Sequence, residues 1–194
     1  NLLLGNNRIT TSKYSGTTLK SINNKIQNSE ITIIDTPGLI PDGRISDLIS
    51  VENGLKLVPA GEISRKTFKL EENQVFMFDA FCRFKILGNE LLENGSKPIF
   101  SAYASKSVKF HVTREERVED LLNGNFFEIL QGSEKKKYFQ NEFVTCEVEI
   151  EENEELAIAG LGWVNVKRGP LKIQLEIPKQ VKVIVRPSIF KNKK

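Results

Sequence analysis

The sequence contains few of the residues that build catalytic or metal-binding clusters. Its 194 residues include two cysteines, one histidine, one tryptophan and one methionine. Cys82 and Cys146 are far apart, each inside an apolar run, which indicates buried thiols in a reducing compartment rather than a disulfide or a zinc site. His111 has no serine or cysteine partner pattern, so we expect a packed or surface strand residue. The composition therefore gives little support to an enzyme built on histidine, cysteine or paired carboxylates.

Long hydrophobic runs are also absent. No apolar stretch reaches the roughly 18 residues that a membrane-spanning helix needs. The sequence shows no signal-peptide pattern either. We therefore expect a soluble, cytoplasmic protein without a membrane span.

Charge is nearly balanced overall but uneven along the chain. The net charge is +3 at pH 7. From residue 179 to the end there are several basic residues and no acidic one, so the rest of the chain is net negative. This end is a candidate for contact with phosphate groups, although a solvated, frayed terminus explains it equally well. The Glu-rich stretch 149–155 is interpreted as a solvated turn that would repel RNA.

An apolar run that leads into Asp-x-x-Gly is the most informative pattern. Residues 31–38 read Ile-Thr-Ile-Ile-Asp-Thr-Pro-Gly. A strand ending at Asp35 places a carboxylate where open α/β sheets bind ligands, and Gly38 allows close approach of its N–H to a phosphate. Asp35 would hold Mg²⁺, and Gly38 would contact the γ-phosphate of GTP. Taken alone, Asp35-Thr36-Pro37-Gly38 is also a good turn sequence.

A second motif upstream favours the GTPase interpretation. Gly16-Thr17-Thr18 lies in a polar loop suited to a switch segment, in which a threonine reaches Mg²⁺ and the γ-phosphate. This motif and Asp35-Thr36-Pro37-Gly38 have the order and spacing of switch I and switch II in translation-factor-like GTPases. The predicted GTP/GDP contacts are therefore Thr17, Thr18, Asp35, Thr36, Pro37 and Gly38, with Thr18 and Asp35 at the metal.

The pattern of the chain changes near residue 61. Ser46 can cap a helix over 47–57, which Pro59 and Gly61 end. From residue 62 the pattern is mostly strands, among them one run over 75–87, with an inserted helix-like interval at 114–122. We expect a part of an α/β P-loop GTPase domain over 1–61, and a mainly antiparallel β-rich domain (α+β) over 62–194.

The first residues indicate a missing part of the nucleotide site. Residues 1–7 read as the last turn of a helix ending at Gly5. We expect a P-loop directly upstream of Asn1. Without that backbone nest and its lysine, the β- and γ-phosphates lose most of their donors, so these residues alone are predicted to be inactive as a GTPase.

Several segments together resemble the circularly permuted GTPases of the YqeH family. They are Asp35-Thr36-Pro37-Gly38, the helix end at Leu55–Pro59, the strand Gly160-Leu161-Gly162-Trp163 and the closing stretch 183–190. The resemblance covers nearly the whole chain. It implies a GTP switch in small ribosomal subunit assembly, with the C-terminal domain contacting rRNA or a ribosomal protein. Leu39 stands where Ras-like GTPases carry a water-orienting glutamine, which implies slow hydrolysis or a group supplied by a partner or cation.

The alternative is a non-catalytic β-domain that binds RNA or protein and carries a vestigial GTPase segment. Lys135-Lys136-Lys137 is expected in an exposed loop. Trp163 is interpreted as filling a β core rather than stacking on a base, and Phe76, Phe78, Phe81 and Phe84 as a buried strand with a bend. The candidate RNA or partner contacts are Arg83, Lys85, Lys106, Lys109, Lys135, Lys136, Lys191, Lys193 and Lys194.

Overall fold

The computed structural model describes residues 21–26, 29–36, 41–71, 73–87 and 96–190. The chain forms two compact units, residues 1–42 and residues 43–194, and each is described by itself. We call the second the β unit. Within the described residues, no helix has the length and apolar character needed to cross a membrane.

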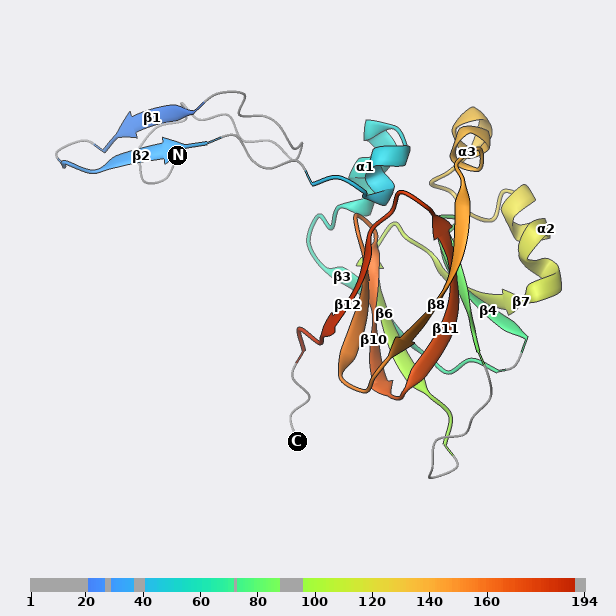
Figure 1. The fold of residues 1–194 in the computed structure, drawn as a ribbon. Helices are drawn as coiled ribbons and strands as arrows, with labels where there is room; N and C mark the ends of the chain where they lie inside the picture. Colours follow the sequence, from blue (N-terminus) through green and yellow to red (C-terminus); the bar gives the residue numbers. More distant parts are fainter. Residues whose placement is uncertain (1–20, 27–28, 37–40, 72, 88–95, 191–194) are drawn as a thin grey trace. The chain divides into compact units, whose positions relative to one another are not determined.

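The described part of the first unit is a two-stranded hairpin (Figure 1). Strands β1 (Ile22–Lys25) and β2 (Thr32–Asp35) pair antiparallel, with Ile22 opposite Asp35. The Ser29 side chain accepts a hydrogen bond from the Ile31 N–H at 3.2 Å and so helps to form the turn. Ile31 and Ile34 are 61% and 58% exposed. Because an isolated hairpin is marginally stable in water, these apolar side chains need further packing partners.

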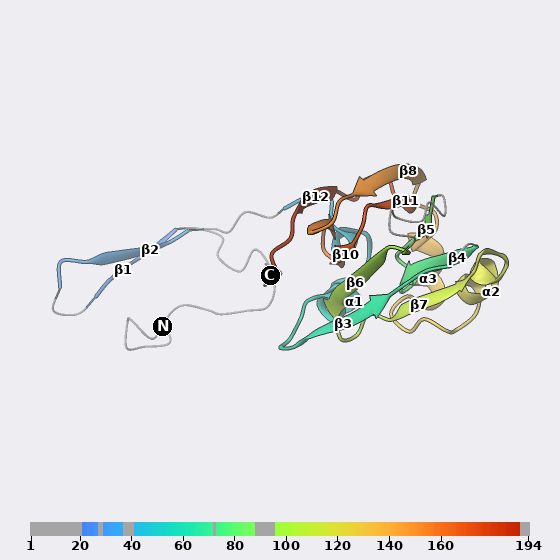
Figure 2. The same ribbon diagram turned by 90° about the horizontal axis from the view of Figure 1, so that it is seen from below.

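The β unit contains two five-stranded antiparallel sheets, seen as two layers in Figures 1 and 2. The predicted antiparallel, β-rich architecture is therefore confirmed. Sheet I has the strand order β12 (Val183–Pro187), β9 (Glu154–Ile158), β10 (Gly162–Arg168), β6 (Ile99–Ser105), β3 (Ile63–Phe68). Sheet II has the order β7 (Phe110–Arg114), β4 (Gln74–Phe78), β5 (Cys82–Ile86), β11 (Leu171–Pro178), β8 (Phe143–Ile150).

Aromatic side chains from both sheets form the centre of the core. The ring of Phe76 lies 5.0 Å from that of Phe84 and 5.3 Å from that of Phe100. Phe76, Phe78, Phe81 and Phe84 are all buried, which agrees with the prediction of a buried segment. Burial raises the pKa of the Cys82 thiol, which also lies inside, whereas Cys146 is only half-buried.

The run 75–87 is a hairpin rather than the single strand that the sequence suggested. The chain turns at Asp79, whose φ is 51°. The Asp79 carboxylate accepts hydrogen bonds from the backbone N–H groups of Ala80 and Lys109, at 2.9 and 3.2 Å. Aspartate tolerates this left-handed conformation because its short side chain bonds nearby backbone, and this turn divides the apolar run into β4 and β5.

The helix predicted over 47–57 begins later than expected. A short 3₁₀ helix, η2 (Ile45–Leu48), precedes α1 (Val51–Leu57), and Ser50 rather than Ser46 is the N-cap of α1. Ile45 and Leu57 are buried in the core of the β unit. The boundary between the compact units thus lies at Asp42/Gly43, whereas the sequence predicted a domain boundary at 61/62.

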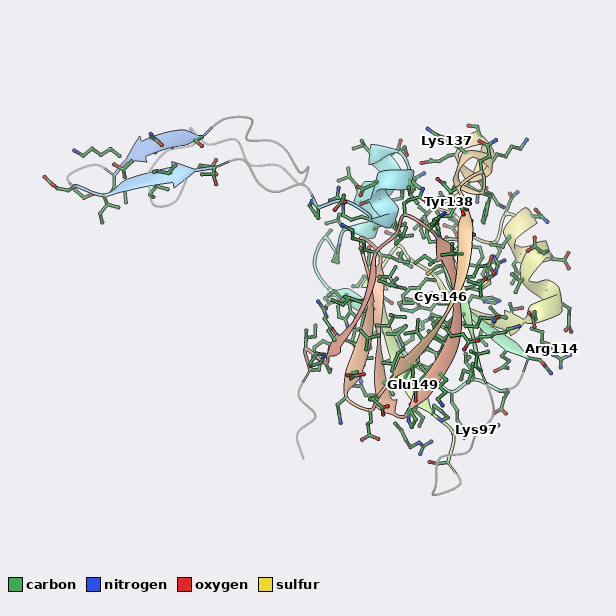
Figure 3. The ribbon with its side chains drawn as sticks, viewed as in Figure 1. Lys97, Arg114, Lys137, Tyr138, Cys146 and Glu149 are labelled. Atoms are coloured by element: carbon green, nitrogen blue, oxygen red, sulfur yellow. The ribbon has the colours of Figure 1, made fainter. Side chains whose placement is uncertain are left out.

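Two further helices lie on the sheet II side of the β unit, α3 beyond one end of β8 and α2 beside β7 and β4 (Figure 1). The 3₁₀ turn η3 (Glu115–Arg117) and α2 (Val118–Asn123) occupy the interval predicted as helical. Helix α3 (Gly132–Tyr138) contains the Lys135–Lys137 run, so the prediction of a loop there is wrong. Tyr138 lies on its inner side, where its hydroxyl donates to the Phe81 carbonyl at 2.7 Å, and Lys137 lies outward (Figure 3). The tertiary contacts of Tyr138 explain why this polar segment is helical.

Candidate functional site

The structure describes two of the six predicted nucleotide-site residues. Asp35 is the last residue of β2 and is half-buried, and Thr36 follows it and is exposed. This places a carboxylate at the carboxyl end of a strand, where sheets of the α/β class bind ligands. Thr17, Thr18, Pro37 and Gly38 lie outside the described residues, as does Leu39. Their contacts with GTP and Mg²⁺ therefore stay predictions.

Four of the candidate RNA-contacting cations form ion pairs. Arg83 contacts Glu176 at 2.6 Å, Lys85 contacts Glu115 at 2.9 Å, Lys106 contacts Glu62 at 2.7 Å, and Lys109 contacts Glu128. Lys109 also lies over the Phe126 ring. Its hydrogen bond and charge lower the pKa of Glu128. The carboxylates offset the positive charge at these four positions, although the exposed pairs, such as Lys106–Glu62, open at little cost.

The only histidine of the sequence packs against an aromatic side chain. His111, in β7, has its ring centroid 4.6 Å from that of Phe126. Burial first, and then the Arg117 charge, lower the pKa of His111. Among the described residues, no group of histidine, cysteine, aspartate and glutamate side chains is arranged to hold a metal ion.

A cleft between α2 and α3 brings together Arg83, Lys135 and Lys136. Its volume is about 540 Å³. We call it the α2–α3 cleft, and its lining residues are Arg83, Glu119, Leu122, Asn123, Asn125, Gln131, Gly132, Lys135, Lys136, Phe139, Phe143 and Glu176. Lys85 lines a neighbouring cleft, and Lys191, Lys193 and Lys194 lie outside the described residues. The structure therefore places three of the nine candidate cations around one concave surface.

The α2–α3 cleft combines apolar and polar walls. The rings of Phe139 and Phe143 stack at 5.9 Å with an interplanar angle of 16°, and both side chains are half-buried. Arg83 bridges Glu176 at 2.6 Å and Glu119 at 3.8 Å. Lys135 donates from its ammonium group to the Gly124 carbonyl at 2.7 Å, which directs this side chain toward the end of α2.

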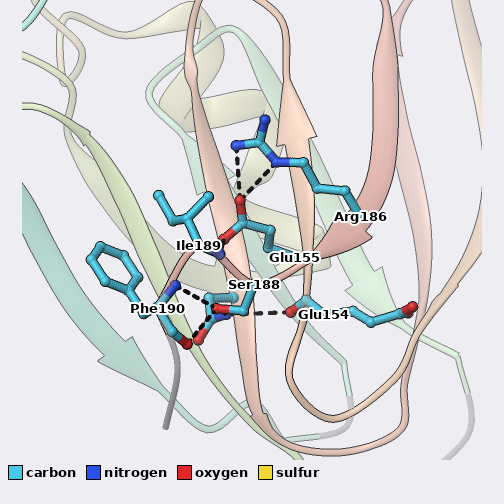
Figure 4. Close-up of polar contacts among 7 residues, drawn as sticks. Glu154, Glu155, Arg186, Ser188, Ile189 and Phe190 are labelled. Atoms are coloured by element: carbon cyan, nitrogen blue, oxygen red, sulfur yellow. Dashed lines mark hydrogen bonds and ion pairs between the residues drawn. The ribbon is translucent and has the colours of Figure 1, made fainter.

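The outer face of sheet I is different, because the end of the chain covers part of it over β9 and β10. Strand β12 ends at Pro187 beside β9, and residues 188–190 then contact side chains of β9 and β10 (Figure 4). Glu155 is completely buried there, and its carboxylate accepts hydrogen bonds from the Arg186 guanidinium at 2.8 Å and the Ile189 N–H at 3.3 Å. The sequence interpretation of 149–155 as a solvated turn is wrong for Glu155. The signal in the sequence was a carboxylate on β9 opposite an arginine on β12.

Trp163 lies on this covered face and not between the sheets. Its ring stacks on that of Tyr103 at 4.9 Å and 3°, and Phe190 packs against Tyr103 at 5.2 Å. Neighbouring Val164, by contrast, is in the core. The interpretation of Trp163 as a core-filling residue is therefore wrong. A Cβ on Gly162 would lie 2.2 Å from the Tyr103 carbonyl oxygen, so this strand pair requires glycine there.

Comparison with known proteins identifies the class of the chain. Residues 1–104 match the 50S ribosome-binding GTPase family, and residues 97–189 match the YqeH-like C-terminal family. Because the first match covers more than half of the sequence, the chain belongs to the 50S ribosome-binding GTPase family, a family of GTP-binding proteins. The match includes the two motifs predicted to be switches and extends from β3 into β6 of the β unit.

The type of GTPase follows from the match of residues 97–189 to the YqeH-like C-terminal family and from one relative. The uncharacterized protein YqeH of Bacillus subtilis (strain 168) is 28% identical to the chain over 185 residues, which are 94% of this chain and 48% of that protein. The chain is thus a YqeH-type GTPase, which confirms the family resemblance seen in its motifs. It spans about half the length of this relative.

Proposed function

We propose that this chain supplies the switch residues of a GTP-binding protein that acts in small ribosomal subunit assembly. The observation that carries the proposal is the β1–β2 hairpin, which ends at Asp35 directly before Thr36-Pro37-Gly38 in a chain of this family. In this proposal the bound nucleotide, GTP or GDP, sets the state of the switch, and the β unit contacts rRNA or a ribosomal protein.

The donor set at the proposed switch suits Mg²⁺ and a phosphate. Oxygen atoms are the ligands that this hard cation prefers, so the Thr18 hydroxyl would bind the metal directly and the Asp35 carboxylate would hold a water molecule on it. Mg²⁺ would neutralise the charge that develops on the phosphates. Gly38 would donate its backbone N–H to the γ-phosphate. Leu39 cannot orient a water molecule by hydrogen bonding, so we expect slow hydrolysis unless a partner or a cation supplies that function.

The 194-residue sequence contains no Gly-x-x-x-x-Gly-Lys-Ser motif. Such a P-loop provides most of the donors to the β- and γ-phosphates. We therefore propose that these 194 residues bind GTP weakly by themselves, and that a longer form carrying a P-loop ahead of Asn1 binds it tightly.

The test is Mg²⁺-dependent binding of a fluorescent GTP analogue to both forms. We expect binding only by the longer form, and a loss of roughly 10- to 100-fold in metal affinity in Asp35→Asn, the usual effect of removing an outer-shell carboxylate. Glu30→Gln is the matched control, because Glu30 is an exposed carboxylate at the turn of the same hairpin, away from Asp35. Equal binding by both forms would contradict the need for a P-loop, and binding by neither would reject the GTP site.

A second candidate function is RNA or protein binding without a nucleotide switch. The β unit is compact by itself and has the α2–α3 cleft on its surface. Absence of GTP binding by the longer form, together with retained binding to ribosomal components, would favour it.

A further inference from the structure

We propose that the α2–α3 cleft binds one unpaired nucleotide of single-stranded RNA, with the base inside the cleft and the adjoining phosphate at Lys135 and Lys136. This inference rests on the proposed function in one respect, the choice of RNA as the partner of the β unit. It adds the site, the part of the RNA that enters it and the orientation.

The size and the apolar wall of the cleft fit a nucleobase. A volume of about 540 Å³ lies within the roughly 300–1,000 Å³ range typical of small-molecule sites. Phe139 and Phe143 present nearly parallel, half-buried rings, and Leu122 is buried beside them. Unpaired RNA bases are commonly bound by stacking on such rings, and every base has a face that can stack.

The polar wall fits the edge of a base. Asn123 and Asn125 are exposed amides that line the cleft, and an amide offers both a donor and an acceptor. Glu119 and Glu176 add carboxylate oxygens, which accept hydrogen bonds from the N–H groups of a base. The same carboxylates repel phosphate. The base, which is uncharged, is therefore the part of the nucleotide that belongs inside.

The cations on α3 fit the phosphate. Lys135 uses one of its three N–H donors on the Gly124 carbonyl and has others for a phosphate oxygen. Lys136 is exposed, and none of the ion pairs found among the described residues includes it. Arg83 differs, because Glu176 and Glu119 already neutralise it. The positive charge that remains for a ligand is thus at the α3 side of the cleft.

This arrangement of charge favours RNA over an acidic protein segment. An acidic peptide that fills the cleft would bring its carboxylates close to Glu119 and Glu176. An RNA strand keeps its charge outside, on the backbone, and inserts only the neutral base. RNA therefore matches both the lysines at the rim and the interior, where the two carboxylates exceed the single Arg83 charge by one.

The experiment measures binding of a fluorescently labelled single-stranded RNA to the full chain by anisotropy, over a series of salt concentrations. Phe139→Leu keeps an apolar side chain but removes the stacking ring, and we expect it to weaken binding roughly 5- to 100-fold. Lys136→Ala should reduce the slope of log K against log salt by about 0.7, the value for one phosphate contact on a single strand. Asn123→Ala, an exposed substitution, tests the polar wall without touching the core.

The matched control is Lys172→Ala, which removes an exposed lysine from β11 in the same sheet but outside the cleft. Binding that is weakened by the cleft variants and unchanged by the control supports the site. RNA binding that none of the cleft variants alters overturns the site while RNA stays the partner. A mononucleotide that binds as tightly as the RNA, or an acidic peptide that displaces the RNA, would overturn the assignment to an RNA strand. If the chain binds no RNA, both the inference and the RNA part of the proposed function are wrong, whereas GTP binding is tested separately.

Discussion

The two outer faces of the β unit use similar side chains in opposite ways. On sheet I, edge strand β12 and the residues 188–190 that follow it bond to polar side chains of β9 and β10. On sheet II, helices α2 and α3 leave between them a cleft of about 540 Å³ lined by charged and amide side chains. On the covered face the Glu155 carboxylate and the Asn165 amide nitrogen have partners within the chain, although the Trp163 Nε1 and the Asn165 Oδ1 have none among the described residues. A face whose charged group is buried against the chain serves stability, and a face that leaves donors and acceptors accessible is suited to a ligand.

One pair of interactions makes the comparison concrete. Each face has an arginine–glutamate pair, Arg186–Glu155 at 2.8 Å and Arg83–Glu176 at 2.6 Å. Glu155 has no exposed surface, whereas the Glu176 side chain is 33% exposed. Removal of the arginine therefore leaves a buried charge in the first case and a partly hydrated one in the second.

The largest effect is expected from Arg186→Ala. This change leaves the buried Glu155 carboxylate with the Ile189 N–H as its remaining donor, and we expect the free energy of unfolding to fall by about 3 kcal/mol. Arg83→Ala is the matched variant on the open face and should cost about 1 kcal/mol or less, because water reaches Glu176. Urea unfolding of the two variants measures the difference. Equal losses would contradict the distinction between the two faces.

A smaller effect is expected from Ser188→Ala on the covered face. The Ser188 hydroxyl accepts a hydrogen bond from the Asn165 amide at 2.6 Å and donates to the Phe190 carbonyl at 3.0 Å. Asn165 is 1% exposed, so its amide group would lose a partner that water cannot readily replace. We expect a loss of about 1 kcal/mol in urea unfolding. Ser107→Ala, in an exposed turn, is the control and should change stability little.

The two faces also show which features of the fold could be predicted from the sequence and which could not. Alternation and turn residues predicted the antiparallel β-rich class, the strand that ends at Asp35, and the helical interval after Arg114. The burial of Glu155 could not be predicted in this way, because its arginine is on another strand, far along the chain. Helix α3 was missed for a similar reason. Glu134 of α3 bonds to the Ser50 N–H and the Asn53 amide, and Tyr138 bonds to Phe81, so tertiary contacts stabilise a segment whose local pattern indicates a loop.

The candidate site likewise combines residues that the sequence could identify with contacts that only the tertiary structure shows. Lysine and arginine residues could be nominated from composition, but their pairing with carboxylates depends on strand register. Register places Glu176 of β11 opposite Arg83 of β5, and the Arg83 charge is neutralised there. Lys135 of α3 and Phe139 at its C-cap are neighbours, one helical turn apart. They line one cleft with Asn123 of α2 and Phe143 of β8 only because the tertiary structure brings these elements together. The cleft is therefore a property of the tertiary structure.

A third prediction concerns pH on the sheet II side. Burial, and then the Arg117 charge, lower the pKa of His111 below its ordinary value of 6.5. Between the folded-state pKa and 6.5, the unfolded chain binds a proton that the folded chain does not, so the free energy of unfolding should rise with pH through this window and level off above 6.5. The difference between wild type and His111→Asn in urea unfolding across this range isolates the contribution of His111. A difference that is constant with pH would contradict it.

The smallest effect on stability is expected at the α2–α3 cleft itself, in Lys136→Ala and Asn123→Ala. Both side chains are exposed, and neither takes part in a side-chain hydrogen bond or an ion pair among the described residues. The free energy of unfolding should therefore stay within about 0.5 kcal/mol of wild type. This near-zero result sharpens the comparison, because the same variants should weaken RNA binding while Arg186→Ala weakens the fold. If Lys136→Ala or Asn123→Ala destabilises the protein as much as Ser188→Ala does, the cleft side chains contribute to the stability of the fold. The contrast between a structural face and a ligand-binding face would then be wrong.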